Sequence, residues 1–234
     1  MERIDALRRT HPLFVIEDAA GALGSTLRGR HAGTFGDIGC FSFNGNKIVT
    51  TGGGGMLVTR NAEWAARARH LANQAKSDPL EYIHDAVAFN YRLSNLQAAF
   101  GCAQMEKLPH FISRRREINR AYRERLAGIP GLSWASEAGD VFWNGWQTTL
   151  AVDAAAFGCS ARQLGAHLLG KNIESRPLWR PVHLSPVHAA QTPFPLPISD
   201  LLYERGLTLP SSGSLSDGQV ERVAHAIAQC HRSG

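Results

Sequence analysis

The sequence lacks the cysteine patterns that hold structural zinc or cross-link small secreted proteins. Its four cysteines, Cys40, Cys102, Cys159 and Cys230, are far apart and include no CxxC pair. Zinc sites and disulfide frameworks usually show tighter spacing. We therefore expect reduced thiols, no bound metal and a cytoplasmic protein.

Long apolar runs are missing as well. No run approaches the roughly 20 apolar residues that a membrane-spanning helix needs. The first residues, Met-Glu-Arg-Ile-Asp, do not follow the basic and then apolar pattern of a signal peptide. We expect no association with a membrane.

Charge of one sign is hardly in excess. The 25 Lys and Arg residues exceed the 20 Asp and Glu residues by only five, and hydrophobic residues make up an ordinary 44%. The arginines are spread out apart from Arg114, Arg115 and Arg116. This triplet suits the solvated face of a helix or, as the alternative, a nucleic-acid patch. We expect the helix face and no nucleic-acid partner, and a mild positive balance also suits an anionic small substrate.

The first part of the chain alternates between helical and apolar segments. Leu13 to Glu17 reads as a fully buried strand after an amphipathic helix, and a parallel strand of this kind needs neighbours. Either later strands complete the sheet or the chain is truncated at its N-terminus. The further elements expected here are helices at Met1–Arg9, at 62–72 capped by Asn61, at 94–104 capped by Ser94 and at 110–127, and strands at 38–43 and 56–59.

The second part of the chain has its own alternating pattern. The expected elements are a strand at 146–152, a helix from the cap Ser160 to about Leu169, an extended piece at 173–175, a proline-rich stretch at 177–197 and a helix at 217–230 capped by Ser216. We find no internal repeats and no low-complexity tracts. The pattern predicts two domains, residues 1–112 and residues 113–234.

Lys47 stands in the densest motif, Ser42-Phe-Asn-Gly-Asn-Lys47, followed by the glycines 52–55. A lysine among small residues beside a strand can approach a ligand closely and act as a nucleophile when its pKa is lowered. Ser42 could donate to a phosphate. The alternative is a surface lysine after a turn. A Walker A loop is excluded, because Asn46 and Ile48 flank the lysine where that motif needs Gly and Ser or Thr.

Two further segments carry candidate polar groups. Asp18 follows the strand at 13–17, where open α/β sheets bind ligands, and would suit the protonated ring nitrogen of a pyridine cofactor. It could equally cap the next helix. The polar residues of Asn90-Tyr-Arg-Leu-Ser-Asn-Leu-Gln97 could be caps and solvated turns, or could reach across a dimer interface, and their spacing does not decide.

Together these segments resemble the DegT/DnrJ/EryC1/StrS family of pyridoxal-phosphate sugar aminotransferases. The matching stretches are VIEDAAGALGS, GDIGCFSFNGNKIVTTGGGGM, NYRLSNLQAA, IESRPLW and LTLPSS, in order along almost the whole chain. The branch that aminates nucleotide-linked 4-keto sugars, for bacillosamine, legionaminic acid or perosamine, is the most similar. The resemblance implies an α/β fold of type I, like aspartate aminotransferase, with residues 1–112 as part of the large domain and residues 113–234 as the small domain.

The resemblance also implies roles for individual residues. Lys47 carries pyridoxal 5'-phosphate and later moves a proton between the sugar carbon and the cofactor. Asp18 pairs with the pyridine nitrogen, Ser42 helps to hold the phosphate, and Asn90 reaches the phosphate of the neighbouring subunit's cofactor. In the small domain, Arg176 and His183 are candidates for substrate contacts, with an exposed arginine and a loop histidine as the alternatives.

The chain departs from the family pattern at two places. Gly21 stands where relatives usually carry Gln, Glu or His beside the cofactor ring, which should weaken or reposition the cofactor. Family chains also begin well upstream, with a Gly-Thr phosphate-binding turn and an aromatic residue that stacks on the ring. We therefore expect a truncated chain that retains the cofactor poorly.

The resulting expectation is transfer of an amino group, from L-glutamate as donor, to a nucleotide-diphosphate-linked keto sugar by a cytoplasmic homodimer. Lys47 would be general acid and base, which requires its pKa to fall toward neutrality. A sugar dehydratase is the enzymatic alternative, but such relatives carry histidine in place of this lysine. The other alternative is a non-catalytic truncated homologue or an assembly partner of a full-length aminotransferase.

Overall fold

The structure is a computed structural model, and it describes residues 1–78, 80–188 and 195–233. Residues 189–194 of the expected proline-rich stretch lie outside the described part. The chain divides into two compact units, one of Met1–Ser113 with Glu137–Trp146 and the other of Arg114–Ser136 with Gln147–Gly234. The segment Glu137–Trp146 thus belongs to the first unit. The expected single boundary at 112/113 does not include this return of the chain.

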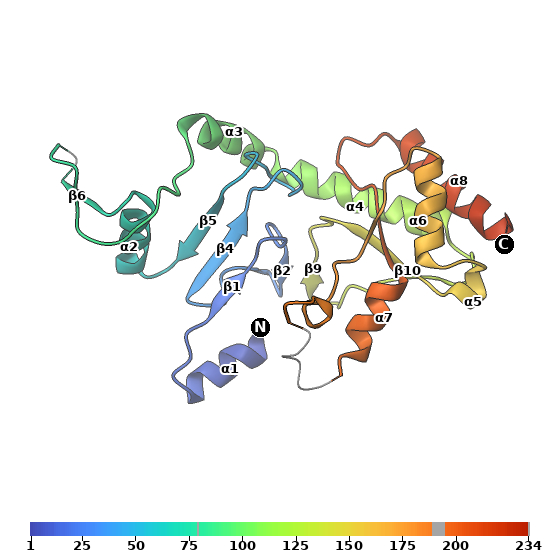
Figure 1. The fold of residues 1–234 in the computed structure, drawn as a ribbon, viewed down its shortest axis with the longest axis horizontal. Coiled ribbons are helices and arrows are strands. Elements are labelled where there is room, and N and C mark those ends of the chain that lie inside the picture. Colours follow the sequence, from blue (N-terminus) through green and yellow to red (C-terminus); the bar gives the residue numbers. More distant parts are fainter. Residues whose placement is uncertain (79, 189–194, 234) are drawn as a thin grey trace. The chain divides into compact units, whose positions relative to one another are not determined.

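The first unit is built around a short mixed sheet with the strand order β1-β4-β5 (Figure 1). Its strands, including those of two smaller sheets, are β1 (Ile16–Asp18), β2 (Thr26–Leu27), β3 (Arg30–His31), β4 (Ile38–Ser42), β5 (Gly55–Thr59), β6 (Lys76–Asp78), β7 (Ile83–His84) and β9 (Val141–Phe142). Its helices are α1 (Glu2–Thr10), α2 (Ala62–Ala72), α3 (Asn95–Glu106) and the first turns of α4 (Leu108–Arg125).

β1 has one parallel neighbour. It pairs with β4, and β5 then returns antiparallel to β4. The expectation of a fully buried strand at Leu13–Glu17 is wrong, because the strand begins only at Ile16 and Leu13, Phe14 and Ile16 are all at least half exposed, while Glu17 is the one buried residue of β1. The reason is topological. β1 is the edge of its sheet, so no described strand pairs along its other side.

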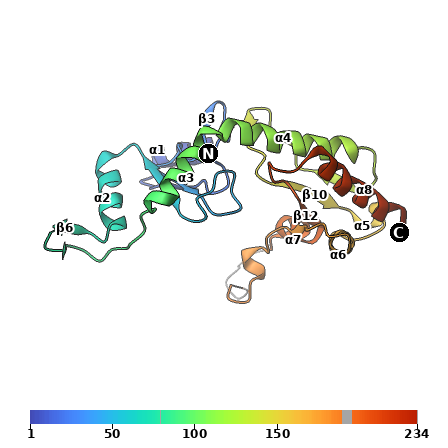
Figure 2. The same cartoon turned by 90° about the horizontal axis from the view of Figure 1, so that it is seen from above.

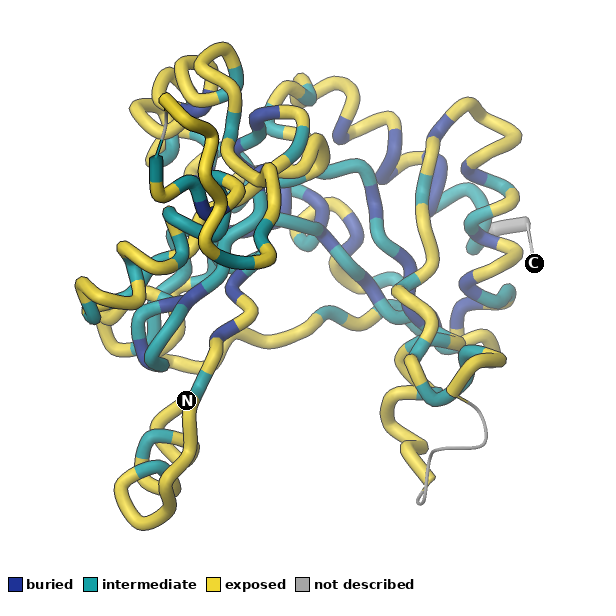
Figure 3. Tube along the Cα trace, turned by 60° about the vertical axis from the view of Figure 1, so that its left-hand side comes forward, coloured by how far each residue is buried: buried dark blue, intermediate teal, exposed yellow. Residues whose placement is uncertain are grey.

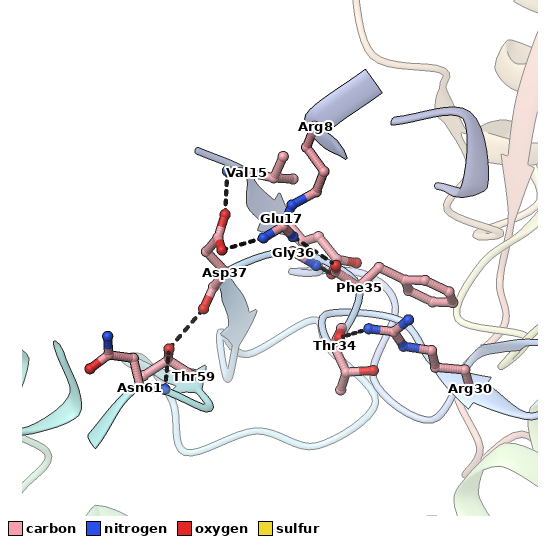
Figure 4. Close-up of polar contacts among 10 residues, drawn as sticks. All are labelled: Arg8, Val15, Glu17, Arg30, Thr34, Phe35, Gly36, Asp37, Thr59 and Asn61. Atoms are coloured by element: carbon pink, nitrogen blue, oxygen red, sulfur yellow. Dashed lines mark hydrogen bonds and ion pairs between the residues drawn. The ribbon is translucent and has the colours of Figure 1, made fainter. Parts of the chain in front are cut away.

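The carboxylates of Glu17 and Asp37 bond to the chain around β1 and the loop before β4 (Figure 4). The buried Glu17 carboxylate accepts hydrogen bonds from the backbone N–H groups of Gly33, at 2.9 Å, and Gly36. The Asp37 carboxylate accepts from the Val15 N–H at 2.8 Å and forms an ion pair with Arg8 at 2.5 Å. A buried carboxylate needs such donors, so these bonds fix the loop before β4 against β1.

The expected helix caps are confirmed. The Asn61 side chain accepts from the N–H groups of Glu63 and Trp64 at the start of α2. Ser94 and Ser160 each form a capping box with the glutamine three residues later, at the starts of α3 and of α6 (Ala161–Gly170). These bonds satisfy N–H groups that have no partner within the helix.

The second unit has an antiparallel sheet with the strand order β11-β12-β10-β8. Its elements are the rest of α4, β8 (Leu132–Trp134), β10 (Thr148–Val152), α5 (Ala154–Phe157), α6 (Ala161–Gly170), β11 (Arg176–Pro177), a 3-10 turn (Val182–Leu184), α7 (Pro197–Arg205), β12 (Gly206–Leu209) and α8 (Asp217–Ser233). Residues of α4, α6, α8 and the sheet form one core (Figure 2).

The core of the second unit is closely packed. Tyr122, Phe157, Leu164, Leu168 and Ile227 are completely buried, and buried positions recur along these helices and strands in Figure 3. The Tyr122 hydroxyl donates to the Pro210 carbonyl at 2.9 Å. Burial raises the pKa of the Tyr122 hydroxyl, so it remains a donor.

The arginine triplet lies on α4, as expected, but it is not a solvated face. All three side chains are partly buried. Arg114 donates to the Leu215 carbonyl at 2.6 Å and to Asp217 at 2.8 Å, and Arg115 donates to the Ser211 carbonyl at 3.1 Å. Arg114 and Arg115 therefore tie α4 to the segment that leads into α8. Among the described residues, no helix is long and apolar enough to cross a membrane.

Candidate functional site

Two strand ends bring the first candidate residues to one edge of the sheet. β1 ends at Asp18 and β4 ends at Ser42, and the two strands run parallel with Asp18 opposite Cys40. The carboxyl ends of neighbouring parallel strands are where open α/β sheets bind ligands. Asp18 and Ser42 therefore share this edge, as the sequence predicts.

The loop between β4 and β5 presents Lys47. Its base is closed by hydrogen bonds of Phe43, whose N–H donates to the Gly54 carbonyl at 3.0 Å and whose carbonyl accepts from the Thr51 N–H at 2.9 Å. Ile48 and Val49 are buried against Phe43. Gly54 has φ +82°, and a Cβ there would lie 2.3 Å from the Leu93 side chain, so this position requires glycine.

Lys47 lies directly before these two buried residues, at the end of a turn in which its N–H donates to the Asn44 carbonyl at 3.0 Å. Its amine is 3.8 Å from the centre of the Trp146 ring. Partial burial lowers the pKa of Lys47, and the charge of Asp18 partly opposes this shift. A lysine whose pKa is lowered has more of the unprotonated amine that can attack a carbonyl. The role of Lys47 as the reactive lysine, against the alternative of a surface lysine after a turn, stays a prediction.

Asp18 accepts a hydrogen bond from the Ala20 N–H at 3.0 Å. Turns follow instead of a helix, so the alternative of Asp18 as a helix cap is wrong. Ser42 accepts from the Asn44 N–H at 3.3 Å, which leaves its hydroxyl hydrogen available to donate. Exposure of the Asp18 carboxylate keeps it open to a cationic partner.

A small pocket joins several of the candidates. It is lined by Gly21, Ser42, Lys47, Asn144 and Trp146, together with Ala20, Leu23, Ile48 and Val49. The structure thus brings Gly21, Ser42 and Lys47 to one pocket, with Asp18 close enough to act on the lysine charge. An amine, a hydroxyl and a carboxylate at one edge can bond to a carbonyl, a phosphate and a ring cation respectively.

The other three candidates are not among the residues that line this pocket. Asn90 is exposed and its backbone pairs with Asn73 after α2. Arg176 and His183 belong to the second compact unit. Arg176 is exposed and hydrogen-bonded to Glu174, and His183 bonds Asp200 at 2.7 Å. Their roles as substrate contacts stay predictions.

Sequence reasoning missed Asn144 and Trp146. Asn144 is completely buried, and its side-chain amide donates to the carbonyls of Gly21, at 2.9 Å, and Leu23, at 3.0 Å. The dipeptide Asn144-Gly145 is a turn pattern, and Gly145 has φ +73°. That local pattern predicts a turn, but nothing in it points to a partner more than a hundred residues earlier. Among the described residues, no group of His, Cys, Asp and Glu could hold a metal ion.

Comparison with known proteins gives consistent matches. Residues 1–228 match the DegT/DnrJ/EryC1/StrS aminotransferase family. The GDP-perosamine synthase of Escherichia coli O157:H7 is 40% identical over 227 residues, which cover 97% of this chain and 61% of that protein. The UDP-N-acetyl-3-dehydro-alpha-D-glucosamine 3-aminotransferase of Acidithiobacillus ferrooxidans is 34% identical over 232 residues, covering 97% of this chain and 60% of that protein.

A solved structure shares the fold. The crystal structure of the aminotransferase TlmJ from Streptoalloteichus hindustanus matches with a TM-score of 0.90 at 29% identity, covering 98% of this chain and 62% of that chain. The expected α/β fold of type I is confirmed by this and similar matches. The chain spans about three fifths of the length of the curated relatives it matches.

Proposed function

Because this chain belongs to the DegT/DnrJ/EryC1/StrS aminotransferase family, we propose that it acts in the pyridoxal-phosphate-dependent amination of a keto sugar carried on a nucleoside diphosphate. One observation carries the proposal. The amine of Lys47, with its pKa lowered by burial, lies at the sheet edge where Asp18 ends the neighbouring parallel strand. An amine and a carboxylate so placed match what this chemistry requires.

The residues at this edge fit pyridoxal phosphate. Lys47 would bond to its carbonyl carbon, the exposed Asp18 carboxylate would pair with its ring nitrogen, and the Ser42 hydroxyl would donate to its phosphate. When bound, the cofactor supplies the electron-withdrawing ring that stabilises negative charge on the substrate carbon. Gly21 leaves that ring without a neighbouring side chain at its own position.

Lys47 has the second task of moving protons. Its Nζ would take a proton from the carbon that carries the amino group of the donor, and would later return a proton to the sugar carbon. A general base works best when its pKa lies near the working pH. The lowered pKa of Lys47 is a shift in that direction.

The substrate proposal rests on the relatives and on charge. One relative is named a GDP-perosamine synthase and another is named for a UDP-linked keto sugar, so we propose a nucleotide-diphosphate sugar with a ketone on its ring. The formal net charge of +5 favours such an anion. L-Glutamate is the proposed donor, and Arg176 and His183 remain the proposed contacts of the substrate. A cytoplasmic location stays a prediction.

We also propose a homodimer. Val87, Phe89, Tyr91, Leu96 and Phe100 expose more than half of their surface each, between the end of β7 and the middle of α3. A contiguous exposed apolar segment commonly marks a protein interface. Asn90 lies within this segment, which supports its proposed reach into the partner's site. Sedimentation velocity with Phe100→Arg tests it, since this change should shift a dimer toward monomer.

A transfer assay tests the proposed activity. The protein is supplied with pyridoxal phosphate, L-glutamate and GDP-, UDP- or dTDP-linked keto sugars, and amino sugar is detected by mass spectrometry. Lys47→Ala should reduce turnover by about a hundredfold or more, whereas the matched control Lys107→Ala at the end of α3 should not change it. Equal turnover in Lys47→Ala would overturn the proposal. Binding of the cofactor without any turnover would favour the non-catalytic alternative.

A further inference from the structure

Trp146 occupies the space that a side chain at position 21 would fill. A Cβ added to Gly21 would lie 2.6 and 2.7 Å from two carbons of the indole ring. Contacts this short do not occur, and an indole ring is rigid, so any larger residue at position 21 would displace it. The glycine and the tryptophan are therefore matched in size, although 125 positions separate them.

The indole is held in place by its own hydrogen bonds and by Asn144. Its Nε1–H donates to the Asn46 carbonyl at 2.8 Å, in the turn before Lys47. The backbone N–H of Trp146 donates to the Asn144 side chain at 3.0 Å, and that side chain donates in turn to the Gly21 carbonyl at 2.9 Å. The ring is thus tied to both loops that it covers.

This fixed ring lies against the Lys47 amine, whose Nζ is 3.8 Å from the ring centre. Two effects of the ring on the amine oppose each other. The face of an aromatic ring attracts a cation by about 0.5–1 kcal/mol at an exposed site, whereas exclusion of water disfavours the charged amine. The charge of Asp18 also acts on the lysine, and it favours the cation. The net lowering of the Lys47 pKa arises from burial, to which the ring contributes.

We propose that Trp146 is a positioning residue for Lys47, seated on Gly21 so that its indole excludes water from the amine and holds it at the mouth of the pocket. The relevance of this contact to catalysis rests on the proposed function. The contact itself does not, because it concerns only residues of this chain. The two ideas can therefore fail separately.

The test measures the reactivity of the Lys47 amine without any cofactor. The protein is labelled briefly with isotopic acetic anhydride across a range of pH, and each lysine is quantified by mass spectrometry. The sequence contains only Lys47, Lys76, Lys107 and Lys171, so the other three are internal references. In the unmodified protein the midpoint for Lys47 should lie below the midpoints of the references.

Trp146→Ala should raise the Lys47 midpoint by about one unit, and Gly21→Ala should raise it in the same direction by displacing the ring. The double variant should add nothing, because both changes remove one contact. In Trp146→Phe, which keeps an aromatic ring, the Lys47 midpoint should lie between those of the unmodified protein and Trp146→Ala. Tyr82→Ala is the matched control, since it removes an aromatic ring 4.8 Å from Lys76 and should leave Lys47 unchanged.

An unchanged or lowered Lys47 midpoint in folded Trp146→Ala would overturn the proposal. Circular dichroism and the thermal midpoint establish that each variant is folded. If Trp146→Ala does not fold, Gly21→Ala and Trp146→Phe decide, because an unchanged midpoint in both contradicts the role of the indole. The expected midpoint shifts in a protein that neither binds pyridoxal phosphate nor transfers an amino group would retain the positioning role and reject the proposed function.

Discussion

The side-chain amide of Asn144 donates a hydrogen bond to the Gly21 carbonyl at 2.9 Å and thereby joins two loops of the first unit. The same amide bonds Leu23 and, through its oxygen, Trp146. Because Asn144 is completely buried, water cannot replace these bonds when they are lost. The position of the ring over Lys47 therefore depends on this asparagine together with the bond from the indole N–H to the Asn46 carbonyl.

Asn144→Ala should lower the free energy of unfolding by about 2 kcal/mol, since it leaves partly buried backbone groups of Gly21, Leu23 and Trp146 without this partner. Chemical denaturation followed by circular dichroism measures the change. The control Asn95→Ala, on the exposed start of α3, should stay within about 0.5 kcal/mol. Equal effects of the two substitutions would contradict the structural role of Asn144.

Glu17→Gln tests the carboxylate that fixes β1. The substitution keeps the size of the side chain but places an N–H₂ group against one of the two N–H donors of Gly33 and Gly36. We expect a loss of about 1–3 kcal/mol in unfolding free energy. Glu106→Gln, exposed at the end of α3, is the matched control and should have little effect. No difference between the two would show that these bonds do not stabilise the loop.

Tyr122→Phe tests the core of the second unit. The change removes only the hydroxyl that donates to the Pro210 carbonyl, so the unfolding free energy should fall by about 1 kcal/mol. Tyr203→Phe keeps the ring that Arg162 covers and should be nearly neutral. A neutral Tyr122→Phe would mean that the Pro210 carbonyl finds another donor.

Cys159 gives a prediction about pH. Burial and the contact with Cys230, at 3.2 Å between sulfurs, raise the pKa of the Cys159 thiol to about 12. Only the thiolate reacts with iodoacetamide, so at pH 8 Cys159 should react about a thousandfold more slowly than a free thiol with the reference pKa of about 8.5, and the exposed Cys102 serves as the comparison within the protein. The rate at Cys159 should rise about tenfold per pH unit until the pH reaches the raised pKa. Mass spectrometry of the alkylated peptides follows both sites, and equal rates in the folded protein at pH 8 would contradict the raised pKa.

The features that could be predicted from sequence are those decided by near neighbours. The caps Asn61, Ser94 and Ser160 bond to groups two or three residues away, so a short pattern contains all the partners. The placement of Asp18 and Ser42 at one edge follows from two parallel strands. The loop between β4 and β5 could be predicted because the glycines that form it lie next to Lys47 in the sequence.

The features that could not be predicted depend on distant partners. Nothing near Trp146 in the sequence indicates that its ring covers Gly21 and Lys47. Likewise, a charged residue such as Arg114 within a helix is expected to face solvent. Its partners, Leu215 and Asp217, are about a hundred residues away in the sequence. The exposure of Ile16 depends on the strand order, which cannot be predicted from the apolar pattern.

Chemical identification of the lysine that binds the cofactor tests the proposed site most sharply. The purified protein is titrated with pyridoxal phosphate under absorbance, reduced with borohydride, digested and mapped by mass spectrometry. We expect a saturable absorbance change and a reduced adduct on Lys47, which is lost in Lys47→Ala. Labelling spread equally over Lys76, Lys107 and Lys171, or none at Lys47, would contradict the claim that this lysine is the centre of the site.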